Sequence, residues 1–475
     1  MEKIAKIKVG LFGIGLDTYW PQFDGLLTRL QGYQKHVNEV ISSYGVELID
    51  CGMVDNPSKA KAASDLLKIN DVELVFLYIS TYALSSTVLP VVQKLNVRTI
   101  ILNLQPTPVI DYEMINNLDD RGKMTGEWLA NCQACSVPEI ASVFNRSSLK
   151  YEIISGYLND AEAWTEISEW IDAAKVAYAM RNNRMGILGN YYGGMLDVYT
   201  DVTKQAAVFG THFEMLEMCE LKALRDEVSN QEIDQKITEF HSTFKVDSVC
   251  ESQEIVRAAH TSVALDKLIS KHNLGSMAYY YEGHSGNEYE NIVTSIIAGN
   301  TLLTGKNIPI AGECEVKNAQ AMKILSEFGA GGSFSEFYGM DFNADLVMLG
   351  HDGPAHSVIA EGEVKLVPLP LYHGKPGKGL SIQMSVKQGH VTILSVVEGL
   401  DGISLLVAEG ASVAGVTLQI GNTNSRYKFP ISAKKFMNDW SKAGPSHHCA
   451  IGVGHIGSKI EKLATLLNTG FIKVC

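Results

Sequence analysis

Four short fragments of the chain carry side chains that could bind a divalent metal ion. They are Ala-Gly-Glu313-Cys-Glu-Val-Lys, Ser-Phe-Ser-Glu336-Phe-Tyr, Val-Met-Leu-Gly-His351 and Gly-Pro-Ser-His447-His448-Cys. Glu313, Glu336, His351 and one of the two adjacent histidines offer two carboxylates and two imidazoles, a ligand set that suits an ion such as Mn²⁺ which must also bind sugar oxygens. The fragments therefore indicate metal-assisted chemistry on a polyol.

Each of these residues, taken alone, also has an ordinary structural explanation. Glu313 lies between a predicted strand and a predicted helix, where α/β proteins place ligand-binding residues, but the helix dipole also favours an acidic residue there. Glu336 lies in an alternating aromatic strand, which predicts a buried carboxylate that needs a partner. His351 ends an apolar strand and could be a hydrogen-bonded structural histidine, and His356 competes for its role.

The adjacent histidines His447 and His448 follow a predicted helix and turn. Neighbouring residues point in different directions, so we expect only one of the two rings to face a shared site. The other ring would then contact and orient a metal ligand rather than bind the metal itself.

The elements that must position these residues begin with an α/β pattern. Apolar runs that are continuous rather than alternating predict parallel strands covered on both faces. In the first part of the chain the predicted strands are 7–12, 46–49, 74–79 and 99–104, with helices at 25–44 and 85–95. A helical stretch at 160–181 leads to a second such pattern, with strands at 185–188, 212–218, 276–281 and 308–311 and helices at 252–271 and 317–328.

The last part of the chain changes to strands separated by turn residues, which predicts mostly antiparallel β structure. The predicted strands are 380–386, 390–397 and 403–408, with Gly389 placed to make a tight hairpin, and helices return at 433–442 and 457–467. We therefore predict two doubly wound α/β domains, 1–170 and 171–328, followed by a β-rich antiparallel C-terminal domain, 329–475.

The composition narrows the class of partner and the compartment. A formal net charge of -13 argues against a nucleic-acid partner, because such affinity comes mainly from basic residues that neutralise phosphates. No apolar run reaches the roughly 18 residues of a membrane helix, and the first residues lack the features of a signal peptide. We expect a cytoplasmic protein with reduced thiols, since its 8 cysteines are scattered through a large chain.

Three other motifs give weaker functional signals than the four metal-binding fragments. Cys132 and Cys135 have the CxxC spacing but lack a second cysteine pair, so a zinc or redox role is not favoured. Gly13-Ile-Gly15 lacks the last glycine of a dinucleotide-binding fingerprint. The polar-aromatic loop that contains Tyr19 and Gln22 could contact a sugar, although a packed loop explains it equally well.

The order and spacing of the four fragments resemble those of the L-arabinose isomerase family, within the wider group that includes L-fucose isomerases. The resemblance covers most of the chain but is tight only around the fragments. It implies that Glu313, Glu336, His351 and His448 bind Mn²⁺, or alternatively Mg²⁺ or Co²⁺, with His448 preferred over His447 by its place in the pair.

The same resemblance implies a reaction and an assembly. The reaction would be reversible isomerisation of a free aldopentose, such as L-arabinose to L-ribulose, through an enediol, with Glu313 and Glu336 as the acid/base pair. Tyr281 and Met195 match substrate-binding positions, with His447 beside the metal. The family forms trimer-based homo-oligomers, commonly hexamers, with active sites at subunit interfaces; no nucleic-acid or membrane partner is implied.

The chain also departs from the family at positions that would face the sugar. Asn131-Cys-Gln-Ala-Cys135 stands where the family has Asn-Gln-x-x-His, so Cys135 becomes a candidate substrate contact. The loop after the first strand likewise differs. The reaction type is therefore better indicated than the sugar. The alternatives are another reaction at the same metal site, such as dehydration or epimerisation of a sugar acid, and a non-catalytic sugar-binding protein, which the third β-rich segment and the ligand set disfavour.

Overall fold

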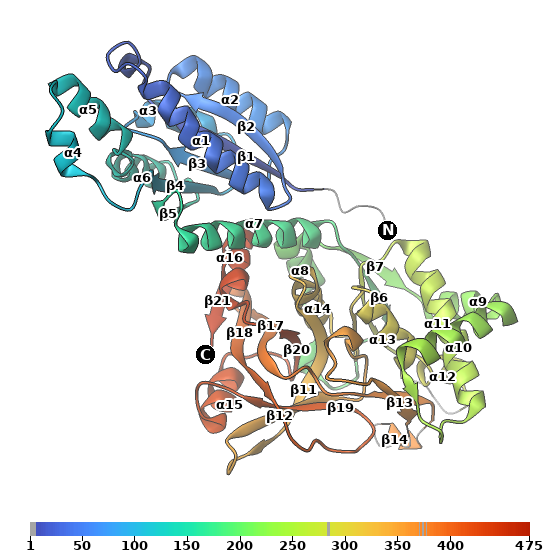
Figure 1. Cartoon of the computed structure of the whole chain (residues 1–475). Helices are drawn as coiled ribbons and strands as arrows, with labels where there is room; N and C mark the ends of the chain where they lie inside the picture. The colour runs from blue at the N-terminus through green and yellow to red at the C-terminus, as the bar shows by residue number, and fades with distance from the viewer. Residues whose placement is uncertain (1–5, 283–285, 370, 373–374, 377) are drawn as a thin grey trace. The chain divides into compact units, whose positions relative to one another are not determined.

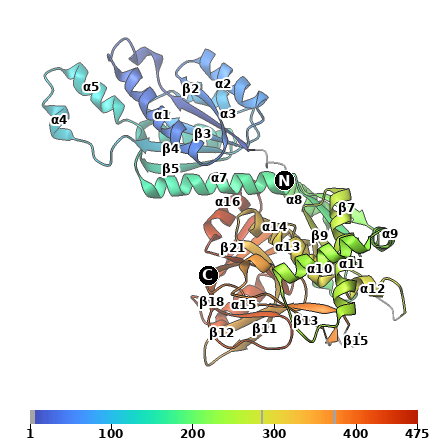
Figure 2. The same cartoon turned by 45° about the vertical axis from the view of Figure 1, so that its right-hand side comes forward.

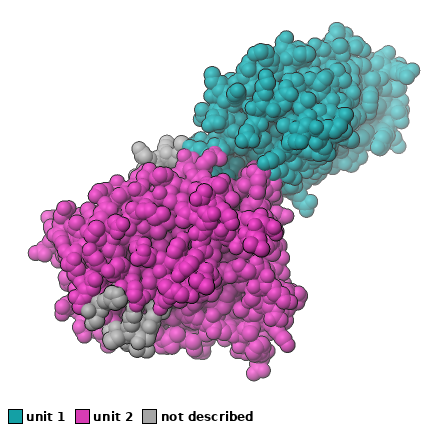
Figure 3. All heavy atoms as spheres, turned by 180° about the vertical axis from the view of Figure 1, so that it is seen from behind, with its two compact units in different colours: residues 1–178 teal, residues 179–475 magenta. Residues whose placement is uncertain are grey.

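The computed structural model describes residues 6–282, 286–369, 371–372, 375–376 and 378–475. The chain divides into two compact units, 1–178 and 179–475, shown in teal and magenta in Figure 3. The division into three domains expected from the sequence stays a prediction. Within the described ranges, every helix is too short or too polar to cross a membrane.

The first unit is built on a parallel sheet with strand order β2-β1-β3-β4-β5 (Figure 1). Every residue of β3 is buried, which explains why its sequence is continuously apolar. The chain steps one way from β1 to β2 and the other way from β2 to β3, so right-handed connections put α1 on the opposite face from α2 and α3. Its strands are β1 (Lys8–Ile14), β2 (Glu47–Val54), β3 (Leu74–Ile79), β4 (Thr99–Gln105) and β5 (Tyr151–Tyr157), and its helices include α1 (Leu26–Ser43), α2 (Pro57–Ile69), α3 (Ser85–Val92), α4 (Tyr112–Asn116), α5 (Arg121–Ala130), α6 (Val137–Arg146) and α7 (Ala161–Arg181), which ends beyond the unit.

The second unit contains another parallel sheet, with strand order β10-β9-β6-β7. Every residue of its strand β9 is buried. Its strands are β6 (Arg184–Gly189), β7 (His212–Leu216), β9 (Ser276–Tyr280) and β10 (Ile310–Ala311), and the helices of this segment include α8 (Val202–Phe209), α9 (Met218–Asp226), α10 (Asn230–Thr243), α11 (Ser252–His272), α12 (Glu290–Val293) and α13 (Ile297–Gly305).

The same unit closes an antiparallel barrel. The strands pair in the order β17-β20-β11-β12-β19-β18, and the pairing of β17 with β18 closes the ring. These strands are β11 (Gly331–Asp341), β12 (Leu346–His351), β17 (Gly389–Gly399), β18 (Gly402–Val413), β19 (Thr423–Lys428) and β20 (His448–Val453), while β21 (Gly470–Lys473) adds to β18 from outside and α15 (Ala433–Lys442) and α16 (Gly457–Leu467) follow the barrel strands. The expected antiparallel C-terminal region is therefore present, and its closure into a barrel is a further finding.

The helix α14 (Val316–Glu327) lies between the parallel sheet and the barrel of the second unit (Figure 2). It contacts β9 and β10 on one side and β11, β17 and β20 on the other. All of its residues from 316 to 326 are buried, so it has no solvent-facing stripe. The segment that enters α14 is therefore held by both the sheet and the barrel.

Two expectations from the sequence are wrong. Gly389 does not form a hairpin with the preceding strand β16 (Leu380–Gln383), because β16 pairs with β13 (Lys365–Pro368) and Gly389 opens β17. The hairpin lies instead at Gly399–Gly402, where Gly402 has a φ of 122° that suits a tight connection.

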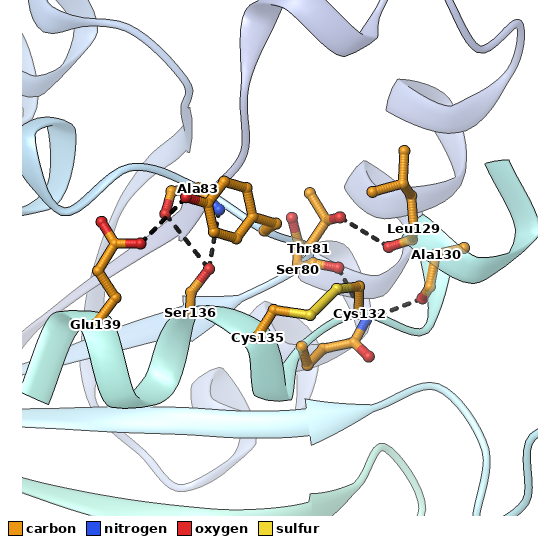
Figure 4. The surroundings of a disulfide bond; sticks show 11 residues. Ser80, Thr81, Ala83, Leu129, Ala130, Cys132, Cys135, Ser136 and Glu139 are labelled. Carbon is orange, nitrogen blue, oxygen red and sulfur yellow. Dashed lines mark hydrogen bonds between the residues drawn. A yellow bond between two sulfur atoms is a disulfide. The ribbon is translucent and has the colours of Figure 1, made fainter. Parts of the chain in front are cut away.

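The second error concerns the cysteines. Cys132 and Cys135 form a disulfide (Figure 4), since the short turn between them brings their Cα atoms to 5.7 Å, within the range that a disulfide spans. The other cysteines, which are Cys51, Cys219, Cys250, Cys314, Cys449 and Cys475, are free thiols.

Candidate metal centre

One rung of the barrel brings three of the predicted ligands together. Glu336 of β11 pairs directly with His448 at the start of β20, and on its other side with Gly350 of β12. His351 follows Gly350 and ends β12. Residues opposite one another in antiparallel strands lie about 5 Å apart, so the strand register alone gathers these side chains. Glu313 reaches them from the segment between β10 and α14.

The side-chain atoms converge around one carboxylate. Nε2 of His448 lies 3.4 Å from Oε2 of Glu313, and Nε2 of His447 lies 3.6 Å from the same oxygen. Nε2 of His447 is also 4.0 Å from Oε2 of Glu336, and Nε2 of His351 is 4.0 Å from Oε1 of Glu313. Five potential ligands therefore surround a space of a few ångströms.

Among the residues that the structure describes, two groups of three could hold a metal ion, with the ligand atoms of each group within 4.8 Å of one another. The first is Glu313, His447 and His448, and the second is Glu336, His351 and His448. His448 belongs to both groups. His356, the competitor of His351 in the sequence, belongs to neither group although it is buried.

Both histidines of the pair are oriented by carboxylates. Nδ1 of His448 lies 2.5 Å from Oε2 of Glu315, and Nδ1 of His447 lies 2.6 Å from Oδ2 of Asp197. The same Asp197 oxygen accepts the backbone N–H of His447 at 3.0 Å. Metal-binding histidines commonly give one ring N–H to a carboxylate, which leaves Nε2 to bind the ion. The structure therefore presents two Nε2 atoms in the orientation that a metal ion requires.

The environment of His448 tests whether an ion fits this site. Its side chain is fully buried, and within the described part of the chain Nε2 has no hydrogen-bond partner. A buried polar atom without a partner is costly. A divalent cation that accepts this lone pair beside the Glu313 carboxylate would remove the cost, so the residues fit a bound metal ion.

The third histidine, His351, is held differently. Its Nδ1 accepts the backbone N–H of Gly353 at 2.9 Å and lies 3.6 Å from Oδ1 of Asp352. The Phe334 ring packs against both His351 and His448, with centroid distances of 4.5 and 4.4 Å. Phe334 is almost fully buried, so its ring fixes the two imidazoles and excludes water from one side of the site.

The backbone that delivers Glu313 is strained. Glu313 and Cys314 have φ angles of 55° and 59°, in the left-handed region that residues other than glycine avoid at a cost of about 1–2 kcal/mol each. Hydrogen bonds hold this conformation, since the Cys314 N–H donates to the Tyr279 carbonyl at 2.9 Å and the Tyr192 N–H donates to the Glu313 carbonyl at 3.4 Å. Such strain persists where the surroundings over-determine it, often at functional sites.

Burial and neighbouring charges shift the pKa values of Glu336 and His447. Burial raises the pKa of Glu336, and Glu313 and Asp352 add to this effect while the two histidines oppose it. The nearby Glu313 carboxylate, with a further contribution from Asp197, raises the pKa of His447 to about 9. His447 therefore carries a proton beside these carboxylates, and metal binding through its Nε2 would release that proton.

The predicted substrate contacts fall in both units. In the second unit, Met195 stands two residues before Asp197, and so lies in the segment that reaches His447. Tyr281 packs edge-on against Tyr289 with a centroid distance of 5.5 Å. The sequence-predicted contacts Tyr19, Gln22 and Cys135 all belong to the first unit.

In the first unit, the loop that contains Tyr19 and Gln22 is held by contacts between its own residues. The Gln22 amide donates to the Thr18 carbonyl at 2.6 Å, and the ring of Tyr19 meets that of Phe23 edge-on at 5.9 Å. Gln22 is exposed and Tyr19 is half-buried. The loop is therefore partly packed, in line with the alternative that it is a packed loop rather than a sugar contact.

No family model matches this chain, and no curated protein matches it either. The chemical interpretation of the site therefore depends on its geometry.

One expectation about the site is wrong, and two partners were missed. Both His447 and His448 face Glu313, because His447 precedes the strand and its ring is turned by Asp197 rather than by strand alternation. Asp197 and Glu315 were not predicted. Glu315 could have been found from its place two residues after Glu313, but Asp197 lies 250 positions from His447 and no local pattern links them.

Proposed function

We propose that this protein is a Mn²⁺-dependent aldose–ketose isomerase that acts on a free aldopentose. The observation that carries the proposal is the buried Nε2 of His448, which Glu315 orients toward Glu313 at a point shared by both candidate ligand groups. Carboxylate oxygens combined with imidazole nitrogens suit Mn²⁺ and leave room for hydroxyl oxygens of a ligand. The resemblance of the four sequence fragments to L-arabinose isomerases supports the same conclusion.

A bound ion would supply Lewis-acid polarisation of the carbonyl of the open-chain sugar, which acidifies the neighbouring C–H bond. Glu313, Glu336, His351 and His448 would hold it. The remaining chemistry is the transfer of one proton between adjacent carbons C2 and C1, which requires a base that becomes an acid. Glu313 and Glu336 are the carboxylates that line the convergence point, and they form this acid/base pair.

His447 and Phe334 support this transfer in different ways. Nε2 of His447 lies between the two carboxylates, 3.6 Å from Glu313 and 4.0 Å from Glu336, so it can donate to a sugar hydroxyl held there. Phe334 closes the buried side of the site. A site dry on that side strengthens the interactions of developing negative charge on the substrate with nearby cations.

The substrate and the assembly follow the same proposal. L-Arabinose, converted to L-ribulose, is the first substrate to test, with Met195 and Tyr281 as sugar contacts in the second unit and Tyr19, Gln22 and Cys135 in the first. A trimer-based homo-oligomer, tested by light scattering, would let neighbouring subunits complete the site.

The test is to incubate the protein with L-arabinose, L-fucose and a panel of other aldoses, with and without Mn²⁺, and to follow the ketose formed. Metal-dependent ketose from at least one aldose is expected. The idea fails if no sugar in the panel is converted. A different product, such as a dehydrated sugar acid, would assign another reaction to the same metal site.

Glu336→Gln tests the acid/base assignment. The variant keeps the shape of the side chain and should lower turnover about 100- to 10,000-fold while the protein stays folded. Glu363→Gln is the matched control, since Glu363 is exposed and pairs with Lys245 away from these ligands. Undiminished turnover in Glu336→Gln would remove Glu336 from the chemistry.

A further inference from the structure

The disulfide between Cys132 and Cys135 takes no part in the proton transfer proposed above, in which Cys135 is only a candidate sugar contact. It occupies the turn between α5 and α6 of the first unit, and the helical run that leads into α6 begins at Ala134. The two cysteines differ in access, since Cys135 is exposed and Cys132 is only 3% exposed. One sulfur-bearing residue is therefore open to solvent and its partner is not.

The segment around the disulfide is already held by hydrogen bonds to the loop that follows β3 (Figure 4). The Thr81 hydroxyl donates to the Leu129 carbonyl at 2.7 Å, and the Gln133 amide donates to the Ser80 carbonyl at 2.8 Å. The Ala83 N–H donates to the Ser136 hydroxyl at 2.9 Å. This segment, residues 129–136, thus stays attached to the loop without a covalent link.

A structural role for the disulfide is weak for a second reason. Only two residues separate the cysteines, and the stabilisation from closing a loop grows with the number of residues enclosed. Small, accessible disulfides of this kind exchange more readily than buried structural ones.

We propose that Cys132 and Cys135 form a reversible thiol–disulfide exchange site whose co-reactant is a dithiol. A thiolate of the dithiol attacks Sγ of Cys135, the S–S bond breaks, and Cys132 leaves as a thiolate that takes up a proton. The second thiol of the reductant then loses its proton and attacks its own sulfur in the mixed disulfide. This step releases Cys135 as a thiol, so one disulfide is reduced and one dithiol is oxidised.

The exchange changes the edge of the sheet where the loops after β1 and β3 meet. The Ser80 hydroxyl donates to the Ile14 carbonyl at 2.5 Å, and Leu129 and Ala130 pack in one cluster with Tyr19. Opening the disulfide removes the covalent link across the turn at 132–135, while the hydrogen bonds of Thr81, Gln133 and Ser136 still attach the segment to this edge. The oxidised form therefore stiffens the turn that lies against the carboxyl edge of the first sheet.

The first experiment uses the unmodified full chain without denaturant. It is equilibrated in mixtures of reduced and oxidised dithiothreitol, quenched with acid, unfolded, alkylated and analysed by peptide mass spectrometry. Cys132 and Cys135 should change together from unlabelled to labelled as the reduced fraction rises, while the six free cysteines stay labelled throughout. The proposal is overturned if the pair is labelled in every mixture, or if it opens only after denaturant is added.

The second experiment tests which sulfur is attacked. After reduction, the native protein is treated briefly with iodoacetamide, and Cys135 should be alkylated at least about tenfold faster than Cys132 because of its exposure. Cys132→Ser should likewise form a mixed disulfide with oxidised glutathione faster than Cys135→Ser. Equal or reversed rates in the reduced native protein would contradict the assignment.

The third experiment measures the consequence for the sheet edge by hydrogen exchange. Reduction should speed amide exchange in peptides that cover residues 129–136 and 80–85, and the double variant Cys132→Ser/Cys135→Ser should show no response to the reductant. Identical exchange in the oxidised and reduced wild-type protein would overturn the stiffening. All three readouts are independent of metal binding and of sugar conversion.

Discussion

Replacement of Glu315 tests the inference that a carboxylate orients His448 for metal binding. Glu315 is not itself in either ligand group, but its Oε2 lies 2.5 Å from Nδ1 of His448. The two side chains are 2% and 0% exposed, so no water can take over the hydrogen bond. Glu315→Gln keeps the shape and one acceptor but removes the charge, whereas Glu315→Ala removes the acceptor.

The two substitutions of Glu315 should weaken Mn²⁺ binding to different extents. Loss of such a partner usually weakens metal affinity about 10- to 100-fold, or about 1.4–2.7 kcal/mol. Glu315→Gln should fall near the lower value, since an amide oxygen can still accept the ring N–H. Glu315→Ala should reach or exceed the upper value, because it leaves a buried donor without an acceptor.

Mn²⁺ binding is measured by isothermal titration calorimetry and by the electron paramagnetic resonance signal of the free ion. Glu363→Gln, on an exposed carboxylate, is the control and should leave the affinity unchanged. Circular dichroism must show that each variant is folded. If folded Glu315→Gln and Glu315→Ala both bind Mn²⁺ within about twofold of the wild type, Glu315 does not orient a metal ligand.

Two further predictions concern stability. Phe334→Ala should lower the free energy of unfolding by about 3–5 kcal/mol, because Phe334 is 1% exposed. The control Phe342→Ala, at a side chain that is 67% exposed, should change this free energy by less than about 0.5 kcal/mol. Urea unfolding of metal-free protein measures both variants, and equal effects would contradict the buried packing role of Phe334. Burial lowers the pKa of His356 to about 4, so the folded state resists a proton that the unfolded state takes up near its ordinary value of 6.5. Stability from this group is therefore present at neutral pH and lost as the pH falls from about 6.5 toward 4, by about 2 kcal/mol at about pH 4.5. His356→Leu should show a correspondingly shallower loss of unfolding free energy in acid, and an unchanged slope would mean that His356 does not titrate in this way.

Local sequence patterns predicted the elements whose formation depends on neighbouring residues. The strand at 74–79 and the helices at 433–442 and 457–467 match β3, α15 and α16 to the residue. A continuous apolar run explains the strand. Ser432 caps α15 by accepting the Lys435 N–H, a pairing that lies within four residues. Such information is contained in a short window of sequence.

The features that were missed depend on residues far apart in the chain. Closure of the barrel requires β20 to pair with both β17 and β11 and requires β12 to pair with β19, and no local periodicity specifies those partners. A glycine between two apolar runs is typical of a turn and predicts a hairpin at Gly389, whereas the preceding strand β16 pairs with β13. Long-range pairing thus overrode local turn chemistry.

At the candidate site, the sequence predicts which residues come together but not how their side chains are oriented. Ligand types and their order in the sequence gather Glu313, Glu336, His351 and His448 into one hypothesis. Strand register brings Glu336, His351 and His448 together, and Glu313 reaches them from the segment before α14. The direction of each imidazole depends on its partner, and the partners are Glu315, the residue just before α14, and Asp197, which lies in a short 3-10 helix. Sequence spacing could not supply that direction.

The two oriented histidines are not equivalent. His448 and its partner Glu315 are buried, on a barrel strand and at the start of a fully buried helix, so neither can turn away without disrupting the core. His447 and Asp197 are 36% and 40% exposed, and Asp197 is held through its carbonyl, which accepts from Lys317 and from Ser446. Since His448 belongs to both ligand groups, an ion held by either group would bind His448, while His447 belongs to one group and could bind the ion or a substrate oxygen.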